Sequence, residues 1–143
     1  MSLIDVENIM ITEQQREEAI ERVTENWRVL ERMSPELKGD RAVVMAAVSQ
    51  DGRALQYASE ELRNDPEIVL AAVKMEGKAL RWASPALQND KEVVMAAVRE
   101  EGRGWLSTRM ADGLKWASPE LKNDREFMLA VVREDRDGWA LRW

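Results

Sequence analysis

The sequence predicts an all-α protein: a short α-solenoid of about four repeats of roughly 25 residues, each a helix, a shorter helix and a turn. Two observations predict this fold. The segments 34–58, 59–83 and 84–102 align without gaps, and the first two are identical at 12 of 25 positions. In each segment an aspartate precedes an apolar run and a glycine ends it, which is typical of the two ends of a helix.

The repeats form one structural domain. Residues 1–33 are an N-terminal segment with a degenerate capping repeat, and residues 34–143 are the tandem helical repeats. The repeat limits are 34–58, 59–83, 84–117 (with an insertion near 103–111) and 118–143. The stretch Glu18–Met33 follows the repeat only weakly. A degenerate sequence is typical of the terminal repeat of a solenoid, because one of its faces meets solvent.

The first helix of each repeat is predicted between its aspartate and its glycine. An aspartate at this place accepts the free amides of a first helical turn and complements the helix dipole. Pro66, directly after Asp65, fits that first turn. The apolar centre of each run is also compatible with a buried strand, but the two ends favour a helix. These ends are Asp40 and Gly52, Asp65 and Gly77, Asp90 and Gly102, and Asp124 and Gly138.

The rest of each repeat is predicted to be a shorter helix and a tight turn. After the glycine comes a segment such as RALQYAS, which we expect to form two turns of helix with its leucine (Leu55, Leu80 or Leu114) facing inward. A serine then caps a single turn and a leucine anchors it. The capping serines are Ser34, Ser84 and Ser118, and the anchoring leucines are Leu37, Leu62, Leu87 and Leu121.

One long pattern recurs along the chain: Tyr/Trp-Ala-Ser-x-x-Leu-x-Asn-Asp-x-Glu-Val-Val-x-Ala-Ala-Val-x-x-x-Gly-x-Ala-Leu. It is carried by Tyr57–Leu80 and Trp82–Gly102, and by Trp116–Leu141 with an insertion. This pattern resembles the tandem repeats of domain of unknown function 4116, over residues 34–143. The resemblance implies a helical-repeat fold. It implies no catalytic residue and no cofactor.

The composition excludes several kinds of chemistry. The chain has no Cys and no His, which excludes disulfides, thiolate ligands and the usual catalytic triads. The net charge of −6 makes nucleic acid an unlikely partner. No apolar run approaches the roughly 18 residues of a membrane span. We therefore expect a soluble, cytoplasmic protein, unless an organellar targeting segment has been removed by processing.

Aromatic residues supply the first candidate binding site. Tyr57, Trp82, Trp116 and Trp143 stand at one equivalent position of successive repeats, so a solenoid places them in a column. Facing inward, the column is core between repeats. Facing outward, it is a groove for a peptide or a partner helix, because aromatic side chains anchor interfaces. Both interpretations stay open at this point.

The insertion is the second candidate. It contains Trp105, Arg109 and Met110, residue types that are enriched at protein interfaces. Insertions in repeat proteins often lie on the binding face. The alternative is that the insertion lengthens the short helix and buries Trp105 in the local core.

Carboxylates suggest metal or acid–base chemistry at two places. The string Asn64-Asp65-x-Glu67 recurs in the later repeats, where a helix cap explains it better than a catalytic group. Asp135–Gly138 begins like a calcium loop, but the chain ends at Trp143, before the glutamate that completes such a loop. We therefore expect no metal site and no cofactor.

These patterns predict a protein that is not an enzyme. The leading hypothesis is a non-catalytic protein-binding or scaffold module, either a subunit of a larger assembly or a protein that self-associates through its C-terminal end. The alternative is a small-ligand binder or enzyme using carboxylates and lysine, which requires a deep pocket with two unlike carboxylates facing each other. A nucleic-acid reader ranks third, with a basic strip of Arg53, Lys78, Arg81, Arg103 and Lys115.

Overall fold

The computed structural model describes residues 11–101 and 110–134, and every regular element within them is a helix. Three kinds of helix alternate. The long helices are α2 (Glu13–Glu25), α4 (Arg41–Gln50), α6 (Pro66–Met75), α8 (Lys91–Glu101) and α11 (Arg125–Glu134). The 3₁₀ helices are η1 (Trp27–Arg32), η2 (Gly52–Tyr57) and η3 (Gly77–Trp82). The short helices are α3 (Pro35–Lys38), α5 (Glu60–Arg63), α7 (Pro85–Gln88) and α10 (Pro119–Asn123).

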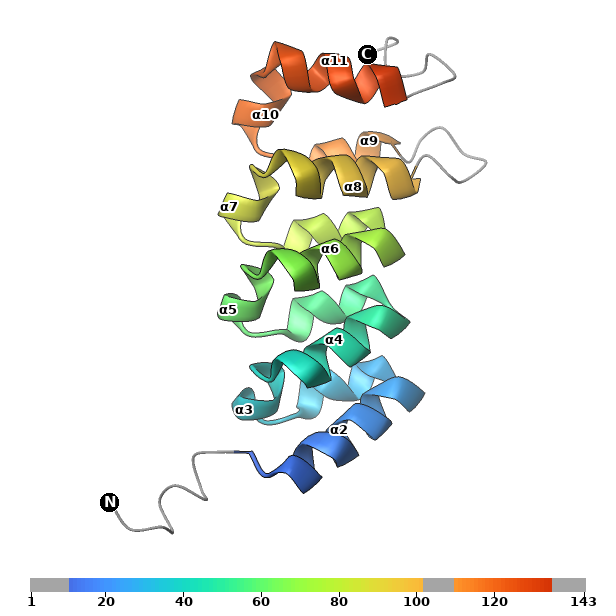
Figure 1. Ribbon diagram of the computed structural model, residues 1–143, viewed down its shortest axis with the longest axis vertical. Coiled ribbons are helices and arrows are strands. Elements are labelled where there is room, and N and C mark those ends of the chain that lie inside the picture. Colours follow the sequence, from blue (N-terminus) through green and yellow to red (C-terminus); the bar gives the residue numbers. More distant parts are fainter. Residues whose placement is uncertain (1–10, 102–109, 135–143) are drawn as a thin grey trace, which may run out of the picture.

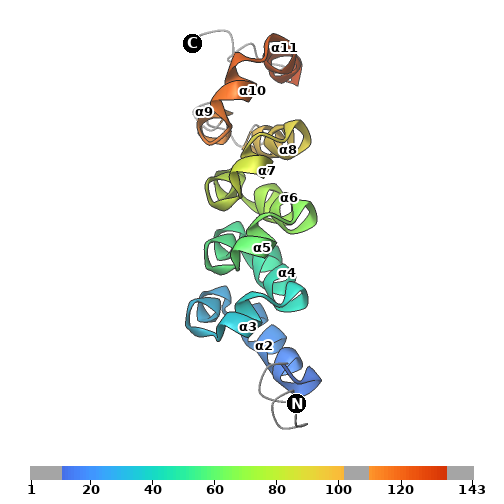
Figure 2. The same ribbon diagram turned by 90° about the vertical axis from the view of Figure 1, so that its left-hand side faces the viewer.

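The elements form a solenoid, as the sequence predicts. The long helices stack in one column, each against the next (Figure 1). The 3₁₀ helices form a second column beside it, and the short helices line one edge between the two (Figure 2). In the third repeat the α-helix α9 (Met110–Lys115) stands in the second column.

Four of the five long helices in the described chain begin at the predicted aspartates, and α2 begins at Thr12. The Asp40 carboxylate accepts hydrogen bonds from the backbone N–H groups of Ala42 and Val43, at 3.0 and 3.1 Å. Asp65, Asp90 and Asp124 accept equivalent bonds at the start of α6, α8 and α11. Each cap satisfies amides that have no partner within the helix, so the aspartates set the start of α4, α6, α8 and α11.

The second element of the repeat differs from the prediction. The segments after Gly52 and Gly77 are 3₁₀ helices rather than two α-helical turns. A 3₁₀ helix has three residues per turn, so residues three apart lie on one face. This spacing puts Gly52 and Leu55 on the buried side of η2, and both are buried.

The prediction that Gly52 ends the long helix is wrong. Asp51, in extended conformation, ends α4, and Gly52 is the first residue of η2. A Cβ atom at Gly52 would lie only 2.4 Å from the carbonyl oxygen of Ala72, in α6 of the next repeat. The glycine is therefore required by close packing between two repeats and not by a helix end.

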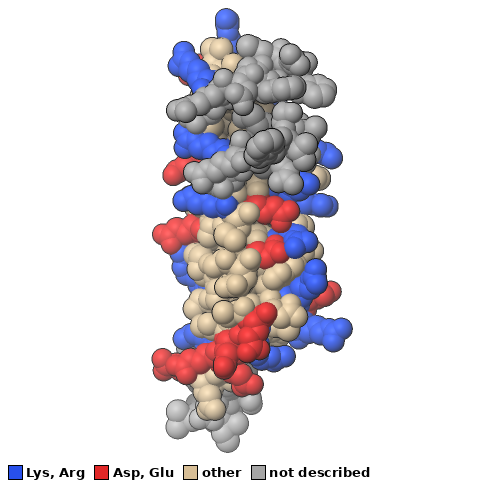
Figure 3. All heavy atoms as spheres, turned by 90° about the vertical axis from the view of Figure 1, so that its right-hand side faces the viewer, with Lys and Arg blue, Asp and Glu red and all other residues tan. Residues whose placement is uncertain are grey.

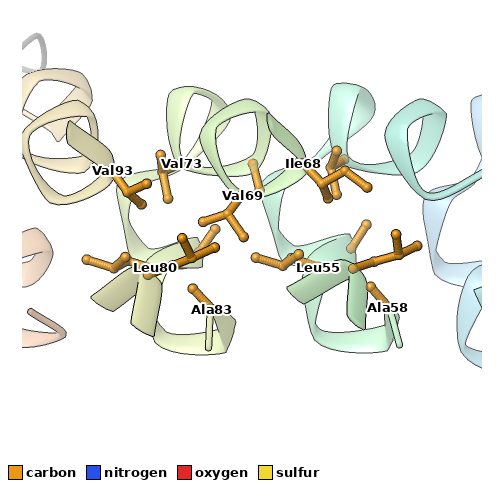
Figure 4. Packing of buried hydrophobic residues seen from close by; sticks show 14 of the residues in the cluster. Leu55, Ala58, Ile68, Val69, Val73, Leu80, Ala83 and Val93 are labelled. Atoms are coloured by element: carbon orange, nitrogen blue, oxygen red, sulfur yellow. The ribbon is translucent and has the colours of Figure 1, made fainter. Parts of the chain in front are cut away.

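The core lies between the two columns. Val69 and Ile68 of α6 face Leu55 and Leu80, which come from η2 and η3 (Figure 4). All four side chains are fully buried. Burying each one stabilises the fold by about 1.5–3 kcal/mol, and the partners come from adjacent repeats. Single repeats therefore have little stability without their neighbours.

Hydrogen bonds join the repeats along the short-helix edge. The backbone N–H of Ser84 donates to the carbonyl of Arg63 (3.0 Å), and its hydroxyl donates to Oδ1 of Asn64 (2.6 Å). Ser118 makes the same pair of bonds to the carbonyl of Gln88 and to Asn89. The insertion precedes Ser118, yet the bonding pattern at this edge is unchanged.

Ion pairs join the long helices at their N-terminal ends. Arg16 pairs with Asp40 through Nε and Oδ2 (2.7 Å), Arg41 pairs with Asp65, and Lys91 pairs with Asp124 (2.8 Å). In each case the cation belongs to one repeat and the capping aspartate to the next. Pro66 stands at this position in α6 and offers no cation to Asp90.

The N-terminal unit, which the sequence predicts to be a degenerate capping repeat, carries polar residues where later repeats are apolar. Glu18 and Arg22 of α2 are exposed at the positions where α4 buries Val43 and Ala47. The unit is more complete than the sequence suggests, since α2 and η1 follow the same order as later repeats.

Candidate binding face

Four aromatic side chains lie along the column of 3₁₀ helices. They are Trp27, Tyr57, Trp82 and Trp116, which we call the aromatic face. Each is half-buried and packs one side against the hydrophobic core. The Trp27 and Tyr57 rings stack with centroids 6.3 Å apart and an angle of 29° between their planes. Half-exposed rings supply rigid apolar area to a partner at little cost in conformational entropy.

Cationic side chains lie over these rings. The Arg81 guanidinium lies 5.2 Å from the ring centre of Trp82 and 5.0 Å from that of Trp116, and so links the two. Lys115 Nζ lies 5.2 Å from the Trp116 ring centre. These distances are within the range of cation–π attraction, which holds the cation against the ring.

Arg53 lies over Trp27 but is also neutralised. Its Nη2 lies 2.6 Å from Oδ2 of Asp51, and its Nε lies 3.6 Å from a Glu76 carboxylate oxygen. The hydrogen bond from Arg53 lowers the pKa of Asp51 below its usual value, because it stabilises the ionised carboxylate. Arg28 also lies over Trp27, 5.4 Å from its ring centre, and like Arg81 and Lys115 it forms no ion pair with any described residue. The two halves of the face differ in that Arg53 is paired with acids, and in that Arg81 contacts two rings whereas Arg28 contacts one.

The opposite edge carries both signs of charge. Figure 3 views the side away from the short helices, where acidic side chains gather over the N-terminal end. Lys and Arg flank an uncharged strip farther along this edge. The acids interrupt any basic surface over this part of the described chain.

Two open pockets of about 400 Å³ occur among the described residues. One is lined by Trp82, Arg63, Glu60 and the Ala83–Pro85 segment. The other is lined by Arg16, Asp40, Arg41, Ala42 and Met45. Each contains a single carboxylate, and Asp40 already caps α4 and pairs with Arg16. Neither pocket has the two facing carboxylates that acid–base catalysis requires.

The comparison with protein families matches three overlapping stretches, residues 16–63, 40–88 and 65–106, to the model of domain of unknown function (DUF4116). The chain belongs to this family. The match begins in α2, earlier than the residue 34 predicted from the pattern, and ends at residue 106. The DUF4116 repeat therefore includes the degenerate first unit. No curated protein and no solved structure matches the chain.

The structure describes three of the residues predicted to form the binding site. Tyr57, Trp82 and Trp116 lie along one column. The Tyr57 ring stacks on Trp27, whereas Trp82 and Trp116 are linked through Arg81. The other predicted residues are outside the description: Trp105, Arg109, Trp143, the side chain of Met110 and the possible calcium loop 135–138.

Trp27 is a residue of this face that the pattern does not predict. It stands 25 residues before Gly52, at the position where the DUF4116 repeat has its glycine. Because the first unit is degenerate, the repeat comparison gives no reason to place an aromatic there. The available signal is local: Asn26 accepts a hydrogen bond from the Arg28 N–H and begins η1, which carries Trp27 to the surface.

No group of three or more acidic residues in the described ranges lies close enough together to hold a metal ion. No described helix is long and apolar enough to cross a bilayer.

Proposed function

We propose that this chain is a non-catalytic protein-binding module, a scaffold or a subunit of a larger assembly, and that the aromatic face is its binding surface. One observation carries the proposal: the half-exposed aromatic side chains Trp27, Tyr57, Trp82 and Trp116 follow one another along the second column of helices. Tryptophan, tyrosine and arginine dominate binding energy in protein interfaces. A solenoid presents such residues as an extended surface. A soluble, cytoplasmic location is part of the proposal.

The other functional hypotheses receive less support. An enzyme or small-ligand site that uses carboxylates needs two of them facing each other, and neither the pocket beside Trp82 nor the pocket beside Asp40 has such a pair. A nucleic-acid reader needs a continuous cationic strip. Arg53 is already paired with Asp51 and Glu76, and the net charge of −6 repels a polyanion. These points favour a protein partner.

Self-association through the C-terminal end is a second candidate, supported by α11. Leu129 is 47% exposed there, and Met128 and Val132 are half-buried. The residues at the positions of Met128 and Val132 are fully buried in α4, α6 and α8. An apolar helix face of this kind is a plausible contact for a second copy of the chain.

Site-specific photo-crosslinking tests the binding proposal. A photoreactive amino acid replaces Glu31, an exposed residue of η1 at the register position of Arg81. The control replaces Glu92, an exposed residue of α8 in the long-helix column. We expect a defined protein adduct from the Glu31 position alone, reproduced with the purified partner and lost on Trp27→Ala. The same adducts from both positions, or none, would refute the proposal.

A further inference from the structure

Arg81 and Lys115 lie at the centre of a cluster of basic residues at one end of the aromatic face. Both lie over the Trp116 ring, and Lys122 reaches the same place, where its Nζ donates to the carbonyl of Lys115 (2.9 Å). Trp82 connects this cluster to the pocket that Arg63 lines. Two cations, Arg81 and Lys115, therefore lie over the two indole rings, and Arg63 and Lys122 lie beside them.

Arg63 differs from its equivalents in the later repeats. Gln88 and Lys122 stand at the same register position, and each donates a hydrogen bond to a backbone carbonyl of the preceding element. The Arg63 Nε is buried and donates to no group in the described structure. A buried donor without a partner costs about 1–3 kcal/mol.

No described acid forms an ion pair with the cations of this cluster, although Glu60 lines the pocket beside Trp82 together with Arg63. Arg16, Arg41, Arg53 and Lys91 all pair with a carboxylate. Arg63, Arg81, Lys115 and Lys122 form no ion pair with any described residue, although acids outnumber bases in the chain by 27 to 21. Mutual repulsion among clustered cations is unfavourable, and a carboxylate supplied by a partner relieves it.

We propose that this end of the aromatic face docks an acidic segment of a protein partner. A carboxylate of the segment pairs with the exposed edge of the Arg81 guanidinium, which is held between Trp82 and Trp116. Arginine binds carboxylates with two parallel hydrogen bonds, and stacking on rings leaves those donors free. An apolar side chain of the segment enters the pocket beside Trp82. The inference rests on the proposed function and specifies the partner's chemistry.

A short acidic peptide fits the charge distribution better than a nucleic acid. Duplex DNA carries one charge per about 1.7 Å, so it presents negative charge along its whole length. The acidic N-terminal end of the array repels such a continuous polyanion. A segment with a few carboxylates contacts only the basic cluster. The acids at the N-terminal end do not repel it, because charges farther apart than the Debye length, about 8 Å at physiological salt, are largely screened.

Peptide selection on the intact chain tests the inference. A phage-displayed library of random twelve-residue peptides is selected on the immobilised protein, with counter-selection on the Arg81→Gln variant. We expect the recovered peptides to be enriched in Asp and Glu. In anisotropy titrations, Arg81→Gln should weaken their binding about tenfold, as expected for a lost charged hydrogen-bonding pair. Replacing the peptide carboxylates with amides should have the same effect.

Arg22→Gln is the matched control, because it removes the same charge from an exposed site at the far end of the array. It should leave binding unchanged. Circular dichroism checks the fold of each variant, and Lys115→Gln replaces Arg81→Gln if the latter does not fold.

Three results overturn the inference. The selection recovers no peptide, or peptides without acid enrichment. Arg22→Gln weakens binding as much as Arg81→Gln does. Or a single-stranded oligonucleotide of equal charge binds as tightly and with the same dependence on Arg81, which assigns the cluster to nucleic acid. A defined adduct at Glu31 together with any of these leaves the proposed function standing, so the two failures are distinguishable.

Discussion

Replacing Gly52 with alanine tests the view that the repeat glycine is a packing residue. The new Cβ would lie 2.4 Å from the Ala72 carbonyl oxygen and 3.3 Å from its carbon. Ordinary contact begins at 3.4 Å, so η2 and α6 must separate by about 1 Å. Overpacking of this kind costs about 1–3 kcal/mol, and the contacting atom is backbone, which cannot rotate away. We expect Gly52→Ala to lower the free energy of unfolding by about 2–3 kcal/mol.

Gly39→Ala is the matched control. Gly39 ends α3 with φ of −96° and ψ of −1°, which alanine adopts without strain. Its Cβ would meet nothing closer than 3.4 Å. Alanine restricts the backbone of the unfolded chain more than glycine does. Gly39→Ala should therefore leave the free energy of unfolding unchanged or raise it by about 0.4–1 kcal/mol.

Thermal and urea unfolding followed by circular dichroism measure both variants. For a chain of this size, about 2–3 kcal/mol lowers Tm by about 6–10 °C. The unfolding transition of Gly52→Ala should also broaden, because the weakened contact joins two repeats and coupling between repeats gives the array its cooperativity. If the Tm and the urea midpoint of Gly52→Ala equal those of Gly39→Ala within experimental error, the packing explanation is wrong.

Three further predictions follow from single contacts. The hydrogen bond from Lys91 lowers the pKa of Asp124 below its usual value of 3.8, so the ionised pair stabilises the fold above that pH. Lys91→Gln should therefore lower the urea midpoint of unfolding at pH 7. The difference from wild type should vanish as the pH falls through the folded-state pKa of Asp124. Ser84→Ala removes a helix cap and a bond to the preceding repeat and should cost about 1–2 kcal/mol. Ser49→Ala removes only a bond within α4 and should be nearly neutral in the same urea titration. If α11 mediates self-association, light scattering should show a mass that rises with concentration for wild type and stays monomeric for Leu129→Glu; equal masses would exclude that contact.

Most of the fold was predictable because its determinants are local and recur. The capping bonds of Asp65 connect atoms two or three residues apart, and Pro66 marks the same helix start. Such features appear in the sequence in the same order as in the structure. Repetition makes the prediction more reliable, because each position of the repeat occurs several times in the sequence.

The features that were not predicted depend on contacts between repeats. Gly52 looks like a helix-ending glycine, and only the position of Ala72 reveals its role. Asn64 looks like part of the helix start beside Asp65, whereas it accepts a hydrogen bond from Ser84 of the next repeat. These partners are 20 residues apart, and their distance is set by the stacking of the units.

The aromatic face was predictable in part for the same reason. Tyr57, Trp82 and Trp116 share a register position, so their alignment follows from the repeat. Whether they face inward depends on the second column of helices, which packs one side of each ring and leaves the other half-exposed. The roles of Trp105 and Trp143 stay predictions.

The stacking of Arg81 on Trp82 and Trp116 makes this face more than a basic patch. A carboxylate pair would hold the guanidinium in place and also cancel its charge. An aromatic ring attracts a cation through its quadrupole and leaves the net charge unchanged. Arg81 is thus held in position but keeps its charge. Because the free protein already restricts this side chain, binding a partner carboxylate costs less conformational entropy. Arg53, which is bound to Asp51 as well as stacked on Trp27, lacks this property. The end of the face near Trp116 is therefore the better place for an acidic partner.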